Sequence, residues 1–252
     1  MKIVIVTTLS DPFSQLFWKS YFNSEGPSLE AIFFLPEKDS NYSFFKKILM
    51  SLFLFGFKGT LCLARLKFNY NLLKKKGCRF YHFQSINKES AINVLKKIEP
   101  DIIVSVGAPQ IFKKEILQIP KLGVLNIHNG LLPKYRGHFG TFWEVFHNEK
   151  RAYISIHKIE EKVDCGEILD FDYLEIKKSV NLLDLLIDKK IRGGNLLAKV
   201  LRGVQKQGII FKTKEIIKEK NNLKNYFPWP SFKDILKFRL QLFKFKAIIK
   251  LF

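Results

Sequence analysis

Hydrophobic positions along the chain fall into short β-branched runs that alternate with segments whose apolar residues recur every three or four positions. The first kind predicts strands buried on both faces of a sheet, and the second predicts amphipathic helices. We expect strands over residues 2–7, 29–35, 78–83, 101–106, 121–128, 152–159 and 166–176. We expect helices over residues 13–22, 88–98, 111–118, 139–148 and 181–202. This alternation predicts an α/β fold with a mostly parallel sheet.

Several segments depart from the alternation. The pair Gly193-Gly194 is expected to weaken the helix over 181–202 in its middle, although Asn181 is a plausible N-cap for it. Residues 225–232 are not expected to form a regular helix or strand, because two prolines flank Trp229. We therefore expect an α/β domain over residues 1–205 with a basic, apolar insertion at about 40–76, followed by a basic extension of helix and loop over 206–252.

The net charge of +20 is concentrated in two segments. Residues 44–76 hold eight Lys/Arg and no Asp/Glu, and residues 211–252 hold eleven Lys/Arg and three Asp/Glu. The positive potential of such segments attracts the phosphates of nucleic acids, anionic lipids or nucleotide-linked substrates. The simpler interpretation is that the lysines only form solvated surfaces. The insertion is a candidate for lying in a membrane interface. The alternatives are packed helices that cover the sheet, or a dimer contact.

Other features restrict the class of protein. The three cysteines lie far apart and form no CxxC pair, so neither a zinc knuckle nor a disulfide framework is indicated, and a cytoplasmic compartment fits best. No signal peptide is visible, and the apolar run from Ile48 to Phe57 is too short to span a bilayer. Neither GxGxxG nor a phosphate-binding GxxxxGK[ST] loop occurs, which argues against dinucleotide and nucleoside triphosphate binding.

The candidate chemistry begins where the strand over 121–128 ends. Asn126 and His128 stand two positions apart, so both side chains project to one side of that strand, and ligands gather at such strand ends. Together with Asp164 they supply an amide, an imidazole and a carboxylate. An amide and an imidazole stabilise an oxyanion, and a carboxylate holds the imidazole and accepts a proton. This set suits acyl transfer without a covalent nucleophile, although a lone Asn-x-His is more often structural.

Three linked motifs make the assignment more specific: NIH at 126–128, LLPKYRG at 131–137 and DCG at 164–166. In this order they resemble the folate-dependent formyltransferase family, which includes glycinamide ribonucleotide formyltransferase, methionyl-tRNA formyltransferase and the sugar N-formyltransferases. The match is good over about residues 100–176 and looser over 1–35 and 77–100. Two departures, Asn129-Gly130 after the histidine and Tyr153-Ile154-Ser155 on the following strand, put the acceptor in doubt.

The resemblance implies a Rossmann-like formyltransferase fold, with helices on both faces of a twisted sheet. It also implies N10-formyltetrahydrofolate as co-substrate and no metal. Asn126 and His128 would stabilise the oxyanion, while Asp164 would hold His128 and collect the proton. The pterin pocket would be lined by Ser105, Val106, Gly107, Ala108, Pro109, Ile159, Glu160 and Val163. The candidate acceptor contacts are Tyr135, Arg136, His138 and His157, with loop fixing as the alternative for Arg136 and core packing for His157.

The segment NYFPWPSFKDILKF is similar to the end of many formyltransferases that act on polysaccharide and lipid-linked sugars. We therefore expect an amino sugar acceptor, nucleotide- or lipid-linked, from cell-envelope polysaccharide synthesis. Methionyl-tRNA and glycinamide ribonucleotide are the alternative acceptors, and a catalytically silent nucleic-acid or membrane-surface binder is the non-enzyme alternative. The expected partners are the folate and the amine, with an anionic membrane surface at the inner face of the membrane and a homodimer left open, and without nucleic acid.

Overall fold

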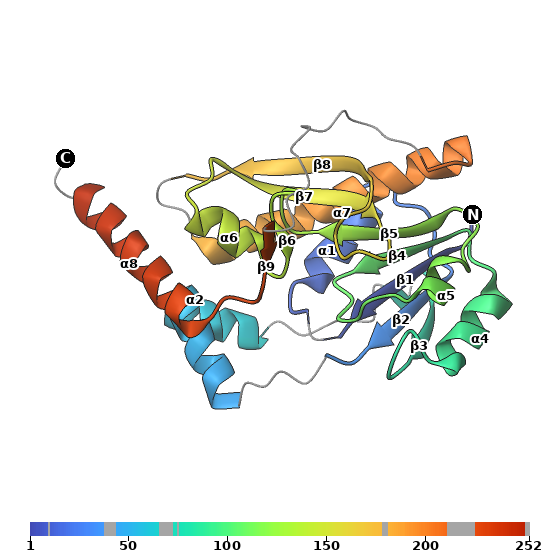
Figure 1. Cartoon of the computed structure of the whole chain (residues 1–252), viewed down its shortest axis with the longest axis horizontal. Coiled ribbons are helices and arrows are strands. Elements are labelled where there is room, and N and C mark those ends of the chain that lie inside the picture. The colour runs from blue at the N-terminus through green and yellow to red at the C-terminus, as the bar shows by residue number, and fades with distance from the viewer. Residues whose placement is uncertain are drawn as a thin grey trace.

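The computed structural model describes residues 1–9, 11–37, 44–65, 73–74, 76–177, 181–210 and 225–249. Its main feature is a seven-stranded sheet in the order β3-β2-β1-β4-β5-β7-β8 (Figure 1). The strands are β1 (Ile3–Thr8), β2 (Ala31–Leu35), β3 (Arg79–His82), β4 (Ile102–Val106), β5 (Gly123–His128), β7 (Arg151–Lys158) and β8 (Ile168–Glu175). Strands β1 to β5 pair in parallel, whereas β7 is antiparallel to both β5 and β8. The predicted α/β fold with a mostly parallel sheet is confirmed.

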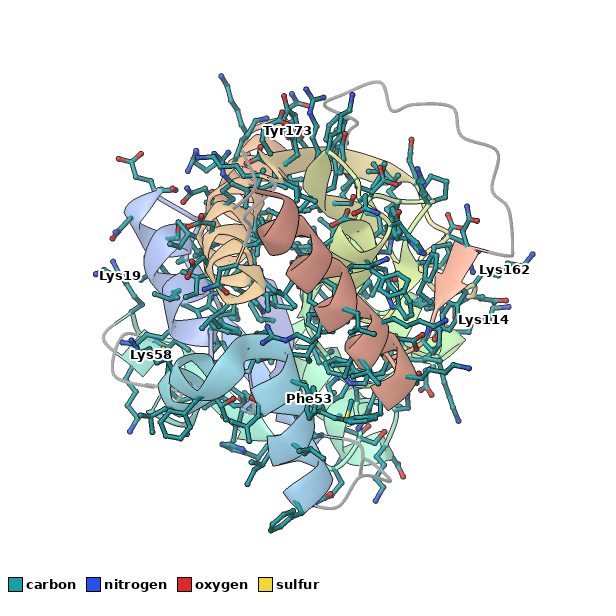
Figure 2. All side chains as sticks on the ribbon, turned by 90° about the vertical axis from the view of Figure 1, so that its left-hand side faces the viewer. Lys19, Phe53, Lys58, Lys114, Lys162 and Tyr173 are labelled. Atoms are coloured by element: carbon teal, nitrogen blue, oxygen red, sulfur yellow. The ribbon has the colours of Figure 1, made fainter. Side chains whose placement is uncertain are left out.

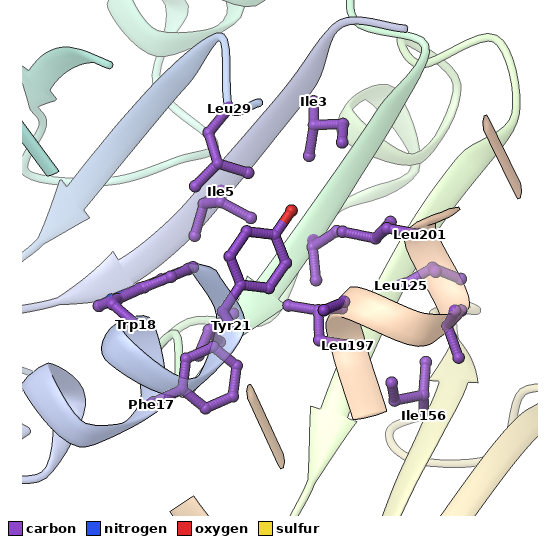
Figure 3. Packing of buried hydrophobic residues seen from close by; sticks show 14 of the residues in the cluster. Ile3, Ile5, Phe17, Trp18, Tyr21, Leu29, Leu125, Ile156, Leu197 and Leu201 are labelled. Atoms are coloured by element: carbon purple, nitrogen blue, oxygen red, sulfur yellow. The ribbon is translucent and has the colours of Figure 1, made fainter. Parts of the chain in front are cut away.

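Helices cover both faces of this sheet. Helices α1 (Ser14–Asn23) and α7 (Leu182–Gln207) pack on one face, and α4 (Glu89–Ile98) and α5 (Lys114–Leu117) pack on the other. Figure 3 shows the first face, where Tyr21 lies between Leu197 of α7 and the strand residues Ile3 and Ile5. The strands are buried on both sides, which is why they read as continuous apolar runs instead of alternating ones.

Helix α7 is continuous through Gly193 and Gly194, where the sequence had indicated a weak point. The reason is the packing of α7 against α1. A Cβ at Gly194 would collide with the carbonyl oxygen of Phe17, so the two helices approach through a position that tolerates no side chain. The conformational cost of glycine in a helix is thus offset by a close contact between helices. The N-cap expected at Asn181 is confirmed, since its Oδ1 accepts from the Leu183 amide at 3.0 Å.

A third cluster of buried residues lies beyond the sheet. It is built from α2 (Phe44–Arg65), α6 (Gly140–Phe146) and α8 (Phe232–Ile249). The described part of the insertion is therefore helical, with a break at Gly56, where φ is 70°. Ile235 and Phe238 of α8 are buried in the same cluster as Phe142, so the extension packs onto the α/β domain. Of the helices that the structure describes, none combines the length and apolar character needed to cross a bilayer.

One expectation from the prolines was wrong. Residues 226–227, directly before Pro228, form a short strand β9 (Tyr226–Phe227) that pairs in parallel with β6 (Arg136–Gly137). The pairing is possible because the prolines begin only after these two residues, so the amides needed for the ladder are still present. The extension thus returns to the loop that follows β5.

Candidate active site

Asn126 and His128 occupy the carboxyl end of β5, at the boundary between the parallel strands and the antiparallel β7. Asn126 pairs with His157 of β7, and His128 pairs with Ser155. The imidazole of His128 is buried, with 7% of the residue exposed, whereas Asn126 is partly exposed. The side chain of Asn126 is therefore more accessible to a bound molecule than the imidazole of His128.

The two ring nitrogens of His128 have different surroundings. Nε2 lies 2.6 Å from the carbonyl oxygen of Tyr135. Because a carbonyl oxygen only accepts, the proton of a neutral ring sits on Nε2. Nδ1 then faces Asp164, with 3.8 Å between Nδ1 and Oδ2. The Asp164 carboxylate therefore lies beside the unprotonated nitrogen of the neutral ring.

Asp164 is held by a tight loop between β7 and β8. The Lys158 amide donates to the Glu167 carbonyl at 2.8 Å, and a Cβ at Gly166 would collide with the Lys158 carbonyl oxygen. Asp164 itself has a φ of 52°, a left-handed conformation that aspartate tolerates better than most residues. Its Oδ2 accepts from the Gly137 amide at 2.9 Å. This turn brings the carboxylate back from the end of β7 to the histidine on β5.

His157 forms a second layer behind the amide of Asn126. The residue is 1% exposed, its Nε2 is 3.0 Å from Asn126 Nδ2, and its Nδ1 is 2.8 Å from the Lys158 carbonyl oxygen. The carbonyl fixes a proton on Nδ1, so Nε2 accepts from the amide. Burial lowers the pKa of His157 to about 4, which keeps the ring neutral near pH 7. Among the described residues, no acceptor takes the second hydrogen of Asn126 Nδ2.

The loop after His128 is anchored by a buried ion pair. Glu144 of α6 and Lys189 of α7 are 0% and 1% exposed, and Lys189 Nζ is 3.1 Å from Glu144 Oε2. Oε1 of the same carboxylate accepts from the amide of Leu131, in the loop, and from the amide of Tyr153, on β7. Burial raises the pKa of Glu144 and lowers that of Lys189, in each case opposed by the charge of the partner.

Strand β9 joins the site from the far end of the chain. A Cβ at Gly137, whose φ is 95°, would collide with the Phe227 carbonyl oxygen, so only glycine permits this pairing. The His138 amide donates to that carbonyl oxygen at 2.8 Å, and the ring of Trp229 stacks on Phe139 at 4.9 Å. The sequence had predicted His138 near the site, but not Phe139, Phe227 or Trp229. The glycine of the YRG motif was the one available signal.

The predicted acceptor contacts are distributed unevenly. His138 is exposed, whereas Tyr135 is 2% exposed and its hydroxyl donates to Glu149 at 2.6 Å. The side chain of Tyr135 therefore fixes the loop, and its backbone carbonyl holds His128. His157 lies behind Asn126 and not on the open side. These two side chains do not have the acceptor-facing positions that we had considered.

Arg136 is the most informative of the four. It is 7% exposed, and its Nε and Nη1 are buried without a hydrogen-bond partner among the described residues. It lies on β6 next to Gly137, whose amide holds Asp164. A buried guanidinium without a counter-charge is costly, so a bound anion would stabilise it.

The residues expected around the pterin fall into two groups. Ser105 and Val106 are buried within β4, so they support the strand end and do not line open space. Gly107 is exposed with a φ of 65°, and nothing lies within 4 Å of a Cβ built there. Ala108, Pro109, Ile159 and Val163 are half-buried, and Glu160 is exposed. The end of β4 is therefore unobstructed at Gly107, and the loop after β7 lies partly exposed. A flat ring that hydrogen-bonds to main-chain groups could fit there.

At this partly exposed strand end, the described residues provide one amide hydrogen without an acceptor, one imidazole and one carboxylate. That set can hold a carbonyl oxygen that gains negative charge, and it can move a proton nearby. Within the described ranges, no three His, Cys, Asp or Glu side chains gather as a metal would require.

Comparisons with known proteins agree with this chemistry. A family model described as formyl transferase matches residues 58–191. A methionyl-tRNA formyltransferase of Finegoldia magna is 33% identical over 146 residues, which are 56% of this chain and 47% of that relative. The chain spans about half the length of the first curated relatives that it matches.

Two solved structures share the fold. A phosphoribosylglycinamide formyltransferase from Bacillus halodurans gives a TM-score of 0.59 at 15% identity, covering 85% of this chain and 100% of that one. A sugar N-formyltransferase from a Shewanella species gives a TM-score of 0.56 at 17% identity, covering 96% of this chain and 87% of that one.

Proposed function

Because the chain belongs to the formyl transferase family, we propose that it is a cytoplasmic enzyme that moves a formyl group from N10-formyltetrahydrofolate to a primary amine. The observation that carries this proposal is the convergence of Asn126, His128 and Asp164 at one strand end. These are the three residue types on which the family motif depends, and the fold brings them together from β5 and from the loop before β8.

In the proposed reaction the neutral amine of the acceptor attacks the formyl carbon. The carbonyl oxygen becomes an oxyanion, which accepts the second hydrogen of Asn126 Nδ2, and the imidazole of His128 adds to its stabilisation. The bond from the formyl carbon to N10 then breaks. The attacking nitrogen loses a proton towards Asp164, and N10 of the folate takes one up, so protons balance over the cycle.

We propose an amino sugar carried on a phosphate, either nucleotide- or lipid-linked, as the acceptor. The support comes from Arg136, whose buried Nε and Nη1 lack partners among the described residues. An arginine fork matches a phosphate in two parallel hydrogen bonds, and the anion would offset the cost of burying the charge. The fold shared with a sugar N-formyltransferase over 96% of this chain is compatible with this acceptor class.

Methionyl-tRNA is the second candidate acceptor, favoured by the names of the curated relatives. The two candidates differ in one testable respect. A tRNA acceptor requires a long basic contact surface, so its rate would fall steeply as salt increases, whereas a sugar phosphate makes few ionic contacts. Glycinamide ribonucleotide belongs in the same panel, because it also offers a primary amine and a phosphate.

The test is a panel of acceptors with N10-formyltetrahydrofolate, read by the mass gain of one formyl group. We expect turnover with at least one phosphate-linked amino sugar, and a rate lower on the order of 10²-fold or more with Asp164→Asn. The variant Arg136→Met should raise KM for phosphate-bearing acceptors and change little for the same amino sugar without its phosphate. Formylation of methionyl-tRNA alone would overturn the sugar assignment, and no transfer to any amine would overturn the activity itself.

A further inference from the structure

We infer that the outer face of helices α2 and α8 docks this protein onto an anionic membrane surface. Apolar side chains stand exposed on that face, including Phe45 at 83% and Phe57 at 75%. Between the helices lies an apolar groove of about 390 Å³, lined by Leu49, Leu52, Phe53, Leu236, Arg239 and Leu240. Figure 2 looks onto this end of the molecule, with both helices in front and Phe53 between them.

Helices α2 and α8 carry apolar residues on their outward side as well as on their inward side, which is unusual for helices at a protein surface. Met50 and Leu54 of α2, and Ile235 and Phe238 of α8, already supply the inward contacts. Leu236 and Leu240 then point outward, with 42% and 58% of their surfaces exposed. A helix that carries large apolar residues on its outward side as well as its inward side commonly meets a second apolar environment, because large exposed apolar patches mark interaction sites.

The charge decides what that second environment is. Helix α2 carries four Lys/Arg and no Asp/Glu, and α8 carries five Lys/Arg and one Asp. Lys58, Lys233 and Lys237 are exposed on these two helices, and Arg239 lines the apolar groove itself. Apolar and basic side chains on one face suit a helix lying in a bilayer interface, where each basic residue near an anionic surface contributes about 1 kcal/mol. A second copy of this chain, with the same positive face and a net charge of +20, would be repelled.

The docking face is connected to the candidate active site through a short segment. Helix α8 begins at Phe232, shortly after β9, and β9 pairs with β6 at Arg136 and Gly137. The ring of Phe232 also lies 5.2 Å from that of Phe53 in α2. Docking would therefore hold the acceptor side of the site near the lipid headgroups. Delivery of a lipid-linked acceptor rests on the proposed function, whereas the docking does not.

The test is flotation of the full chain with vesicles of phosphatidylcholine, with and without phosphatidylglycerol. We expect binding that requires the anionic lipid and weakens as salt is raised. The double variant Leu236→Ser/Leu240→Ser should abolish it, and Lys233→Glu/Lys237→Glu should weaken it by at least about tenfold. The matched controls lie outside α2 and α8: Ile111→Ser, 66% exposed, and Lys19→Glu/Lys114→Glu should leave binding within about twofold, and circular dichroism should show all variants folded.

Absence of vesicle binding, or equal binding with and without phosphatidylglycerol, would overturn the inference. So would loss of binding in the control variants at the same level as in the α2–α8 variants. A dimer in sedimentation that Leu240→Ser dissolves, or RNA bound at this face without vesicle binding, would assign the face to that partner instead. Formyl transfer to a soluble acceptor, measured without lipid, should be equal in all these variants, so a failure of docking and a failure of the proposed activity are separate results.

Discussion

The amide nitrogen of Asn126 donates to Nε2 of His157 across 3.0 Å, and the other ring nitrogen of His157 is fixed by the Lys158 carbonyl. This relay determines which end of the Asn126 side chain faces the ring. An amide that rotated by half a turn would present its oxygen to the ring nitrogen lone pair and would be repelled. His157 is therefore a positioning residue, acting through Asn126, for the donor that we propose holds the oxyanion.

Replacing His157 by leucine should lower kcat for formyl transfer on the order of 10²-fold with little change in KM, because the amide is freed to rotate. His157→Gln is the matched control, since its carbonyl oxygen can accept from Asn126 without titrating. We expect it to keep most of the activity. Steady-state kinetics of the two variants tests whether His157 positions Asn126. Equal activity of His157→Leu and the wild type would contradict that role.

The low pKa of His157 also predicts a pH dependence of stability. Burial holds this pKa at about 4, whereas an unfolded histidine titrates near 6.5. Between these values the histidine is protonated in the unfolded chain but not in the folded one, which favours unfolding. The free energy of unfolding is therefore unaffected by His157 well above pH 6.5, and it falls as the pH drops from about 6.5 towards 4. From about pH 7 to about pH 5 the wild type should lose roughly 2 kcal/mol more than His157→Gln. Thermal unfolding at both pH values measures the difference.

Asp164→Asn should lower the rate on the order of 10²-fold or more while leaving the fold intact. Asparagine tolerates the left-handed backbone at this position, and its oxygen can still accept from the Gly137 amide, so only the charge opposite His128 is lost. His128→Ala should lose activity to a similar degree. A near wild-type turnover of Asp164→Asn, with a good acceptor, would contradict the assigned roles.

Removing one partner of the buried pair Glu144–Lys189 should lower stability strongly, whereas replacing both by neutral residues should lower it little. Lys189→Met leaves the Glu144 carboxylate buried without its cation, which should cost about 3–5 kcal/mol and lower Tm on the order of 10 °C. The double variant Glu144→Gln/Lys189→Met keeps an oxygen for the amides of Leu131 and Tyr153 without a charge, and it should recover most of the loss. Calorimetry of the single and double variants tests this, and equal Tm values in both would show that the charge does not matter.

The two glycines of α7 should respond differently to alanine. At Gly194 a Cβ collides with the backbone oxygen of Phe17, which cannot move without shifting α1, so we expect a loss of about 2 kcal/mol. At Gly193 the nearest atom is the side-chain tip of Ile127 at 3.2 Å, which can turn aside, and alanine gains up to about 1 kcal/mol in helix propensity. Gly193→Ala should therefore stay within about 1 kcal/mol of wild type in denaturant unfolding.

The sequence by itself determined the sheet and its principal helices. The spacing of apolar residues and the β-branched runs reflect burial over a few neighbouring residues. The local pattern was therefore enough to predict β1 to β5 and α7. The strand end with Asn126 and His128 was also visible, because spacing along one strand fixes which side chains share a face. The linked motifs added Asp164, whose distance in the chain gave no geometric reason to place it there.

Tertiary structure decided the rest, because it depends on contacts between residues far apart in the chain. The weakening expected at Gly193-Gly194 does not interrupt α7, since α1 fills the space that side chains would have taken. Tyr226 and Phe227 became a strand only because Arg136 and Gly137 offered an edge. His157 could be assigned as the support of Asn126 only once the antiparallel register of β5 and β7 set the two side by side. Local pattern encodes what each segment prefers, whereas the partner that satisfies its hydrogen bonds and charges is chosen by the assembled fold.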